Sequence, residues 1–330
     1  MLKQTKVKNI TPLEGSISLL RKSANLRKGE KVLIITELGV DNRVSDTLMK
    51  AVKEIGGESV VIKMDKLKYP GAEPPKIVSD AMLSSDLIIS ATSSILFYTD
   101  ARTKACDSGA RFISMTGVNM EVLASEAMTV DFRKNEPIVI KFKKILDRAK
   151  RVRLTSESGT LLELSVLGRT AIVNSGICDR AGMYCGAPDI EAYIAPIEDS
   201  VEGKIVIDGS TSVTGLVTDP ITITFKHGLA TDIDGGAEAK KLIEILNNTE
   251  SRESFKVGEL GIGLNPLAKV RGANIEDEGS LGTAHIALGN NVKFGGKINA
   301  PTHIDNVMRK VTLSIDGYTP IKKGKLLLKV

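Results

Sequence analysis

Two of the chain's three histidines lie near its C-terminal end, in a spacing that suggests metal chemistry. His303 stands two residues before Asp305, and residues two apart on an extended strand point to the same face. An imidazole and a carboxylate on one face form part of a ligand set for a divalent ion. We expect His285 to reach the same ion from a neighbouring strand or turn. The third histidine, His227, ends a predicted strand and is not expected in this site.

Two glutamates in apolar surroundings are candidates for further ligands. Glu191 lies in an apolar segment between Pro188 and Pro196, and Glu259 begins a glycine-rich apolar segment. A buried carboxylate is costly unless it is paired with a charge or bound to a cation. We therefore predict metal-related roles for both, beside the alternative that each is an exposed strand residue. The Asp-Glu-Gly run at 277–279 is predicted to be a surface turn that can support the site from outside.

The composition argues against a nucleic-acid-binding or membrane protein. The chain has 330 residues, of which 42% are hydrophobic and 26% charged, with a formal net charge of +5. Aromatic residues make up 4%, and the densest basic run, residues 143–153, is interpreted as a solvated helix face. No stretch approaches the roughly 20 apolar residues of a membrane span. We predict neither a nucleic-acid nor a membrane partner.

The cysteines and the N-terminus favour a cytoplasmic location. Cys106, Cys178 and Cys185 are an odd number of cysteines without CxxC spacing, which argues against a disulfide framework. Residues 3–8 include three lysines, which interrupt the apolar core that a signal peptide needs. The expected setting is therefore reducing and intracellular.

The first half of the chain, residues 1–150, alternates short apolar runs with helical patterns. This alternation predicts βαβ units around a parallel sheet, in an α/β domain of Rossmann-like or flavodoxin-like type. Expected strands cover 31–36, 59–64, 86–90 and 111–115, and expected helices 42–55, 75–82, 99–108 and 120–126. Neither a GxGxxG nor a GxxxxGK[ST] motif is present, so no cofactor-binding residues are predicted. This half is interpreted as a scaffold or lid.

The second half, residues 151–330, is predicted to be a β-rich α+β catalytic domain, mainly antiparallel, that carries the metal site. Runs at 151–155 and 160–166 flank a Ser-Glu-Ser-Gly turn, which is a hairpin signature. Further strands are expected at 203–208, 221–225 and 311–315, and one helix at 237–247.

The order and spacing of the candidate ligands resemble those of a known family, the thermophilic, leucyl aminopeptidase-like metallo-aminopeptidases of the aminopeptidase T type. The resemblance covers about residues 185–325 and rests on Pro188, Glu191, Pro196, the Gly258-Glu259 pair, the run at 282–289 and the His303-Ile304-Asp305 motif. It implies two divalent ions, zinc, cobalt or manganese, held by Glu191, Glu259, His285, His303 and Asp305.

The same resemblance implies a homodimer that releases N-terminal residues from peptides through a metal-activated water. Glu191 is then a ligand or the general base for that water, and Glu259 is a ligand that can bridge the ions. One position departs from the family pattern, because the catalytic tyrosine seven residues after the first histidine is Val292 here. Valine cannot donate a hydrogen bond to a developing oxyanion.

Tyr184, Tyr193 and Tyr318 are candidates to replace the missing tyrosine. Two alternatives to the metallo-aminopeptidase also stay open. Non-haem Fe(II) dioxygenases that open dihydroxypyridine rings share the architecture, keep the HxD pair and take their other histidine nearer the position of Glu259. A metal-binding homologue without catalytic activity is the other alternative. Because Glu259 and His285 are both present, we expect the aminopeptidase, acting on a peptide or small-molecule substrate.

Overall fold

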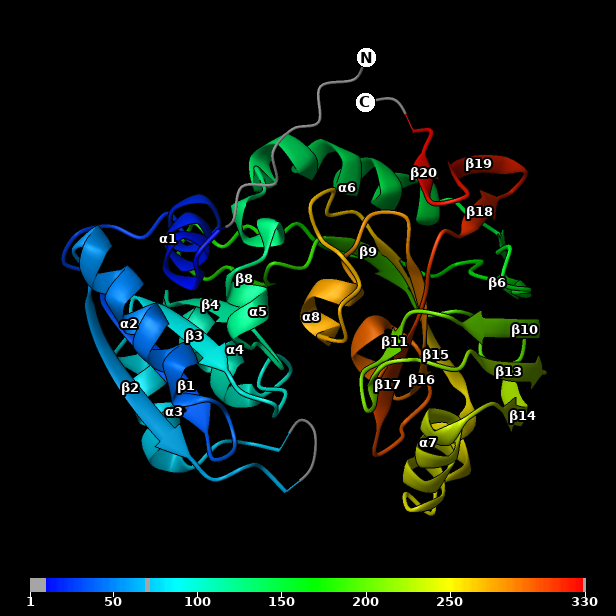
Figure 1. Cartoon of the computed structure of the whole chain (residues 1–330), viewed down its shortest axis with the longest axis horizontal. Coiled ribbons are helices and arrows are strands. Elements are labelled where there is room, and N and C mark those ends of the chain that lie inside the picture. Colours follow the sequence, from blue (N-terminus) through cyan, green and yellow to red (C-terminus); the bar gives the residue numbers. More distant parts are fainter. Residues whose placement is uncertain (1–9, 69–71, 329–330) are drawn as a thin grey trace.

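The first half of the chain forms the predicted parallel sheet, flanked by helices (Figure 1). The computed structural model describes residues 10–68 and 72–328. The sheet has the order β2-β1-β3-β4-β8, and each neighbouring pair is parallel. Its strands are β1 (Lys31–Glu37), β2 (Glu58–Met64), β3 (Leu87–Ala91), β4 (Arg111–Ser114) and β8 (Tyr184–Gly186). The helices of this half are α1 (Pro12–Lys22), α2 (Asn42–Ile55), α3 (Lys76–Leu83), α4 (Asp100–Asp107), α5 (Met120–Leu123), α6 (Phe132–Leu146) and the short 3₁₀ helix η1 (Glu126–Thr129).

Local sequence signals explain where these helices begin and end. α1 begins at a capping box, in which the Thr11 hydroxyl accepts from the Glu14 N–H and the Glu14 carboxylate accepts from the Thr11 N–H. α2 begins after its N-cap Asp41 and ends at Gly56, whose φ of 93° is the left-handed conformation that glycine adopts readily. The bounds of α2 are those predicted, and the predicted strands of this half are present with ends that differ by one residue.

The second half consists of two antiparallel sheets with short helices, which confirms the predicted fold class. The larger sheet has the order β14-β13-β10-β6-β5-β18-β19-β20 and the smaller β12-β11-β17-β16-β15-β9-β7. The strands of the larger sheet are β5 (Arg151–Thr155), β6 (Leu161–Ser165), β10 (Glu202–Ile207), β13 (Ile221–Lys226), β14 (Leu229–Asp234), β18 (Thr312–Ile315), β19 (Tyr318–Lys322) and β20 (Lys325–Leu326). Those of the smaller sheet are β7 (Ile172–Asn174), β9 (Glu191–Ile194), β11 (Ser210–Thr211), β12 (Gly215–Leu216), β15 (Val257–Gly263), β16 (Ala284–Gly289) and β17 (His303–Met308). The helices are α7 (Ala237–Asn247), α8 (Asn274–Asp277), η2 (Arg252–Phe255) and η3 (Val292–Phe294).

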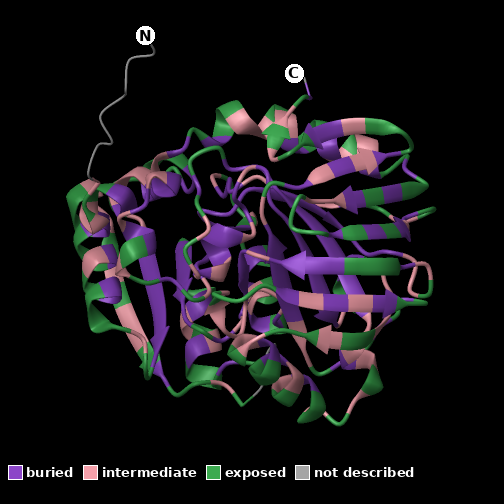
Figure 2. Ribbon diagram, turned by 45° about the vertical axis from the view of Figure 1, so that its right-hand side comes forward, coloured by how far each residue is buried: buried purple, intermediate pink, exposed green. Residues whose placement is uncertain are grey.

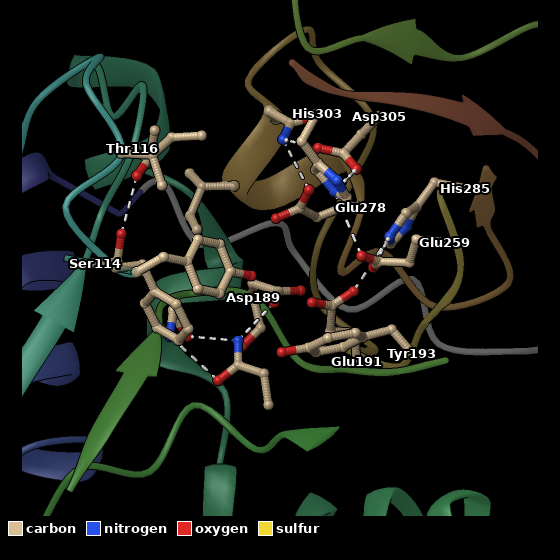
Figure 3. Close-up of a pocket in the computed structure, with 17 residues that line it drawn as sticks. Ser114, Thr116, Asp189, Glu191, Tyr193, Glu259, Glu278, His285, His303 and Asp305 are labelled. Carbon is tan, nitrogen blue, oxygen red and sulfur yellow. Dashed lines mark hydrogen bonds and ion pairs between the residues drawn. The ribbon is translucent and has the colours of Figure 1, made fainter. Parts of the chain in front are cut away.

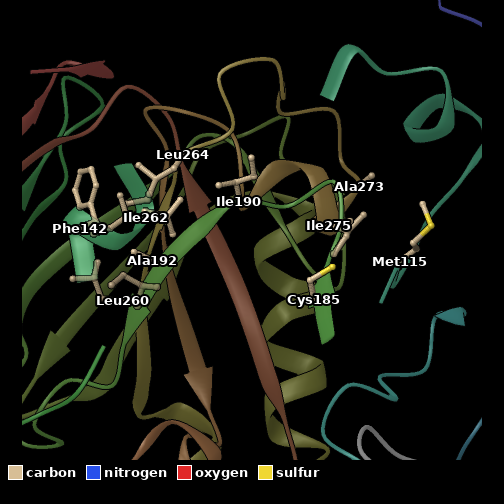
Figure 4. Close-up of a cluster of buried hydrophobic side chains, with 14 of the residues drawn as sticks. Met115, Phe142, Cys185, Ile190, Ala192, Leu260, Ile262, Leu264, Ala273 and Ile275 are labelled. Atoms are coloured by element: carbon tan, nitrogen blue, oxygen red, sulfur yellow. The ribbon is translucent and has the colours of Figure 1, made fainter. Parts of the chain in front are cut away.

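The smaller antiparallel sheet has one apolar face, which packs into the core. Alternate residues of β9, β15 and β16, among them Ala192, Leu260 and Ile286, are fully buried in a large cluster of hydrophobic side chains. Phe142 of α6 belongs to the same cluster and lies beside this face in Figure 4. Figure 2 shows buried residues concentrated along the strands and exposed residues on the outer helices and loops. The opposite face of the sheet is left free to build a site.

The two halves are joined more closely than a division at residue 150 implies. β8 lies beyond that residue, yet it pairs in parallel with β4 and completes the first sheet. The large hydrophobic cluster also includes side chains from both halves. The domain bounds 1–150 and 151–330 therefore stay a prediction.

Several sequence-based expectations concern the cellular setting. Among the described residues, none of the helices combines the length and the apolar character that a membrane crossing requires. Cys106, Cys178 and Cys185 are free, as expected, and all three are buried. The lysine-containing run at 3–8 lies outside the described residues. The cytoplasmic location, the homodimer and the lack of a nucleic-acid partner stay predictions.

Candidate metal centre

His285, His303 and Asp305 lie on one face of the smaller antiparallel sheet. His303 and Asp305 are two residues apart on β17 and therefore share a face, as their spacing predicts. β16 pairs with β17 in a register that places His285 directly opposite Val307. Val307 is again two residues from Asp305, and directly opposed residues share a face of the sheet. His285 thus reaches the site from the neighbouring strand.

The same register extends the site to the two strands beyond β16. On β15, Gly261 stands opposite His285 on one side and opposite Tyr193 of β9 on the other. Gly263 of β15 stands opposite Glu191, the first residue of β9. Glu191 and Tyr193 therefore point to the same face as His285, and Figure 3 shows these side chains gathered on one side of a pocket.

A β-bulge at Gly258 turns Glu259 towards the site. Val257 pairs with Leu288 on the core face, whereas Glu259 pairs with Ala287 on the site face. In a regular strand residues 257 and 259 would share a face, so the extra residue at 258 reverses the alternation. A Cβ at Gly258 would lie 2.4 Å from a backbone oxygen of β16, so the bulge needs glycine. The glycine at 258 thus allows the bulge that turns the Glu259 carboxylate to the site face.

Gly261 provides the space that the His285 ring occupies. A Cβ at this position would lie 2.0 Å from the ring Nε2. The Gly261→Ala variant is expected to displace the ring and weaken metal binding by at least about tenfold, an effect typical of disturbing a ligand's orientation. A titration with a divalent metal measures this, and Ile262→Val, on the core face of the same strand, is the control. Equal metal affinity in Gly261→Ala and wild type would show that the ring position is unimportant.

The predicted ligands contact one another directly. The Nε2 atom of His285 lies 3.2 Å from Glu259 Oε1 and 3.5 Å from Glu191 Oε2. The Nε2 atom of His303 lies 3.4 Å from Glu259 Oε2 and 3.3 Å from Asp305 Oδ1. Glu259 therefore links the two imidazoles, and the five side chains named by the sequence form one cluster.

The chemistry of this cluster fits a divalent cation. His303 Nδ1 lies 2.8 Å from the Asn290 carbonyl oxygen, which fixes the hydrogen on Nδ1 and leaves the Nε2 lone pair for a metal. The Oε2 atom of Glu191 is buried and has no hydrogen-bond partner among the described residues. One ligand atom each from Glu191, Glu259 and His285 lies within 4.8 Å of the others. Mixed nitrogen and oxygen donors of this kind suit first-row divalent metals.

Burial and mutual charge shift the pKa values in this cluster. Burial tends to raise the pKa of Glu259, but the hydrogen bonds with His285 and His303 outweigh it and leave that pKa lowered. Burial, reinforced by the neighbouring Asp189, raises the pKa of Glu191 well above its ordinary value. Burial tends to lower the pKa of both histidines, yet the adjacent carboxylates raise both. Without a cation the cluster therefore retains protons that a bound metal would displace.

The cluster opens into a cavity of about 110 Å³ that the first half of the chain helps to close. Phe97 and Tyr98 follow β3, and Ser114 and Thr116 stand at the carboxyl end of β4. This is the edge of a parallel sheet at which ligands bind in α/β folds. Figure 3 shows Ser114 and Thr116 on the side of the pocket opposite the two histidines.

A comparison with known proteins assigns the chain to a family. A model of the family described as 2,5-dihydroxypyridine 5,6-dioxygenase matches residues 18–328. The chain belongs to this dioxygenase family. A 2,5-dihydroxypyridine 5,6-dioxygenase from Pseudomonas putida KT2440 is 20% identical over 332 residues, which cover 93% of this chain and 93% of that protein.

Two solved structures share the fold over almost the whole chain. The 2,5-dihydroxypyridine dioxygenase from Pseudomonas putida KT2440 has a TM-score of 0.78 at 19% identity, covering 96% of this chain and 97% of its own. Wild-type AmpT from Thermus thermophilus has a TM-score of 0.66 at 15% identity, covering 96% and 99%. The resemblance to the aminopeptidase T type therefore holds for the scaffold.

The expectation of a hydrolase acting on peptide bonds is wrong for the function. Both the family that matches and the curated relative are dioxygenases, which are oxidoreductases. The order of the ligands led to the aminopeptidase because two families share one scaffold, and residue spacing follows the scaffold. The expected aminopeptidase activity and a role in proteolysis are therefore wrong as well, whereas a candidate site for a divalent metal is retained.

Val292, which stands where the aminopeptidase family has its catalytic tyrosine, does not lie inside the cavity. Val292 begins η3, is half exposed and does not line the pocket. Tyr184 and Tyr318 are also about half exposed and lie outside the pocket lining. Of the three candidate tyrosines, Tyr193 alone lines the cavity.

Sequence reasoning missed several polar residues of the cavity. Asp189, Asn174 and Asn274 line it, and nothing in their spacing signalled this. The predicted surface turn at 277–279 is wrong, because Asp277 is fully buried at the end of α8 and Glu278 lines the cavity. The Asp277 carboxylate accepts two backbone N–H groups, at 2.7 and 2.8 Å, from the loop before α8, which makes its burial tolerable.

Proposed function

We propose that this chain is a non-haem Fe(II) dioxygenase that opens a dihydroxylated aromatic ring of the dihydroxypyridine class. The observation that carries the proposal is the placement of His285, His303 and Asp305 on one sheet face, in a chain of the dioxygenase family. Two histidines and one carboxylate, with coordination positions left open, are the ligand type of Fe(II) oxygenases. Iron bound there would supply the one-electron chemistry that lets dioxygen react with the ring. Iron thus replaces the zinc, cobalt or manganese of the initial expectation.

Tyr98 and Tyr193 line the cavity beside the ligands and offer a wall for a flat substrate, and Phe294 packs against both. The Phe294 ring lies 5.2 Å from the His303 ring and 5.5 Å from the rings of Tyr98 and Tyr193, in edge-to-face arrangements. Aromatic rings attract one another at such separations, so an aromatic substrate gains specific contacts here. A cavity of about 110 Å³ also favours a small substrate.

Polar groups around this wall are placed to orient the substituents of the ring. The hydroxyls of Ser114 and Thr116 lie 2.9 Å apart and can hydrogen-bond a substituent remote from the metal ligands. Glu191 lines the cavity, with its Oε2 3.5 Å from His285 Nε2, and we assign it to orient a ring hydroxyl beside the metal centre. Glu259, between the imidazoles, is assigned to orient them or to join the ligand set.

Oxygen uptake tests this proposal. Metal-free protein is loaded anaerobically with Fe(II) and mixed with a panel of dihydroxypyridines and dihydroxybenzenes. We expect equimolar consumption of dioxygen and loss of the ring's ultraviolet absorption with at least one dihydroxylated ring. Zn²⁺-loaded protein is the control and should consume no oxygen. Absence of uptake across the whole panel, with iron shown to be bound, would overturn the proposal.

A further inference from the structure

The cavity contains more carboxylates than a centre of two histidines and one carboxylate uses. Asp189 precedes β9, Glu191 begins β9 and Glu278 follows α8, and all three line the cavity. One oxygen atom from each lies within 4.8 Å of the others. With Glu259 and Asp305 they bring five carboxylates to a cavity whose lining, among the residues that the structure describes, has two histidines and neither lysine nor arginine. Two imidazoles cannot balance five buried carboxylates, so the excess carboxylates need protons or a further cation.

Two of these carboxylates have unused oxygens deep in the protein. Asp189 is 2% exposed and Glu191 8% exposed, yet Asp189 Oδ1 and Glu191 Oε2 lack hydrogen-bond partners among the described residues, with His285 Nε2 3.5 Å from the Glu191 oxygen. The other oxygen of Asp189 is held by the Asn174 amide at 2.5 Å. Buried polar atoms are rarely left without a partner, so an unpaired oxygen that faces a cavity is available to a water, a ligand or an ion.

Neighbouring groups hold the third carboxylate in place. The Asn274 amide donates to Glu278 Oε2 at 2.8 Å and to Asp305 Oδ2 at 3.0 Å, which ties the acidic group to the histidine centre. Gly279 lets its loop approach the strand, because a Cβ there would lie 2.2 Å from Asp189 Oδ1. The positions of these side chains are therefore fixed by contacts with their surroundings.

We propose that Asp189, Glu191 and Glu278 bind a second divalent cation of the hard type, such as Mg²⁺, Mn²⁺ or Ca²⁺, beside the histidine centre. All three donors are carboxylate oxygens, which are the ligands that suit hard cations, whereas the histidine nitrogens suit iron or zinc. Glu191 also belongs to a group with Glu259 and His285, and Glu278 to a group with His285 and Asp305, so both are placed to contact both ions. This site differs from the two-ion set implied by the aminopeptidase resemblance, which leaves out Asp189 and Glu278. The second site rests on the proposed function in one respect only: the histidine centre must take a softer metal than the cation bound by the three carboxylates.

Manganese binding to zinc-loaded protein tests the second site. Zn²⁺ has no electron paramagnetic resonance signal and binds mixed nitrogen and oxygen sites more tightly than Mn²⁺ does, so one equivalent fills the histidine centre first. Titration with Mn²⁺, followed by its paramagnetic resonance signal, is expected to show one further ion per chain. Glu278→Gln and Asp189→Asn should each weaken Mn²⁺ binding by at least about tenfold and keep the zinc stoichiometry, which also reports that the variants are folded.

Glu276→Gln is the matched control for this titration. Glu276 is a fully buried carboxylate of the same segment whose Oε2 also lacks a hydrogen-bond partner among the described residues, but it does not line the cavity, and its Oε1 accepts from Ser125 at 2.6 Å and lies 3.5 Å from Arg271 Nε. It should leave Mn²⁺ affinity unchanged. Absence of a Mn²⁺ ion beyond zinc, or Mn²⁺ binding that both cavity variants leave unchanged, would overturn the second site. If the wild type binds no Mn²⁺ and Glu278→Gln binds substrate more weakly, the second site is also overturned. The carboxylates would then hold a cationic group of the substrate instead. Because Mn²⁺ binding is measured without turnover, its result is independent of the dioxygenase assay.

Discussion

The His303→Ala variant is expected to stay folded and to lose iron-dependent oxygen uptake by at least about a thousandfold. Losing a residue that supports a metal ligand typically costs roughly 10–100-fold, and losing the ligand itself should cost more. His303 is placed for this role by its contacts. Its Nε2 atom faces Glu259 and Asp305 at 3.4 and 3.3 Å, and its Nδ1 atom is occupied by the Asn290 carbonyl. Alanine removes the nitrogen donor and leaves two carboxylates facing each other.

Iron stoichiometry and oxygen uptake, measured on the same preparations, check this expectation. His227→Ala is the matched control, since the side chain of His227 is 76% exposed and lies at the surface end of β13 and β14. It should keep full activity and full iron content. Retention of wild-type uptake by His303→Ala would show that the histidine is not a ligand, whereas a shared loss in both variants would point to general damage. Thermal melting of both variants separates these outcomes.

Much of the fold was predictable because the signals are local. Helix α2 begins at an Asp cap and ends at a left-handed glycine, both of which are visible in the sequence. The parallel sheet follows from alternation of apolar runs with helices. His303 and Asp305 share a face because strand alternation has a period of two, which no tertiary contact can change without a bulge.

The rest of the site depends on contacts between segments distant in the chain. The bulge at Gly258 reverses the alternation of β15, and only the pairing with β16 reveals it. Gly261 is required because His285 happens to stand opposite it. Glu278 and Asp189 come together through a loop packed on a strand, and an Asp-Glu-Gly run gives no local sign of burial.

The function was mispredicted for a related reason. Glu259 and His285 match the aminopeptidase pattern, but residues on a shared scaffold keep their order whatever reaction the site performs. Several metals also accept the same nitrogen and oxygen donors, so the ligand list leaves the chemistry open. Agreement with the dioxygenase family over residues 18–328 supplied the information that the spacing lacked.

The metal-free protein is expected to lose stability as pH rises from about 5 to about 8, and a bound cation should reverse this trend. Burial raises the pKa of Asp189 from 3.8 to about 7 and, with neighbouring carboxylates, raises the pKa of Glu191 and Glu278 well above ordinary values. The folded chain therefore holds more protons than the unfolded chain in this range, and raising the pH favours unfolding. The raised histidine pKa values act in the same direction. The lowered pKa values of Glu259 and Asp305 affect stability only at lower pH.

Thermal melting of metal-free protein across this pH range measures the effect, with a fall on the order of 5 °C expected for a loss of roughly 2 kcal/mol. A divalent cation replaces the protons on these ligands, and protons compete with it less as the pH rises. The metal-loaded protein should therefore gain stability with rising pH. Asp189→Asn should flatten the metal-free dependence, whereas Glu163→Gln, at a carboxylate 67% exposed in a surface ion pair, should leave it unchanged. A melting temperature that is constant or rises with pH without metal would mean that the buried carboxylates are stabilised by their protein neighbours alone. The cavity would then have no electrostatic need for a cation, and the metal assignment would rest on the histidines.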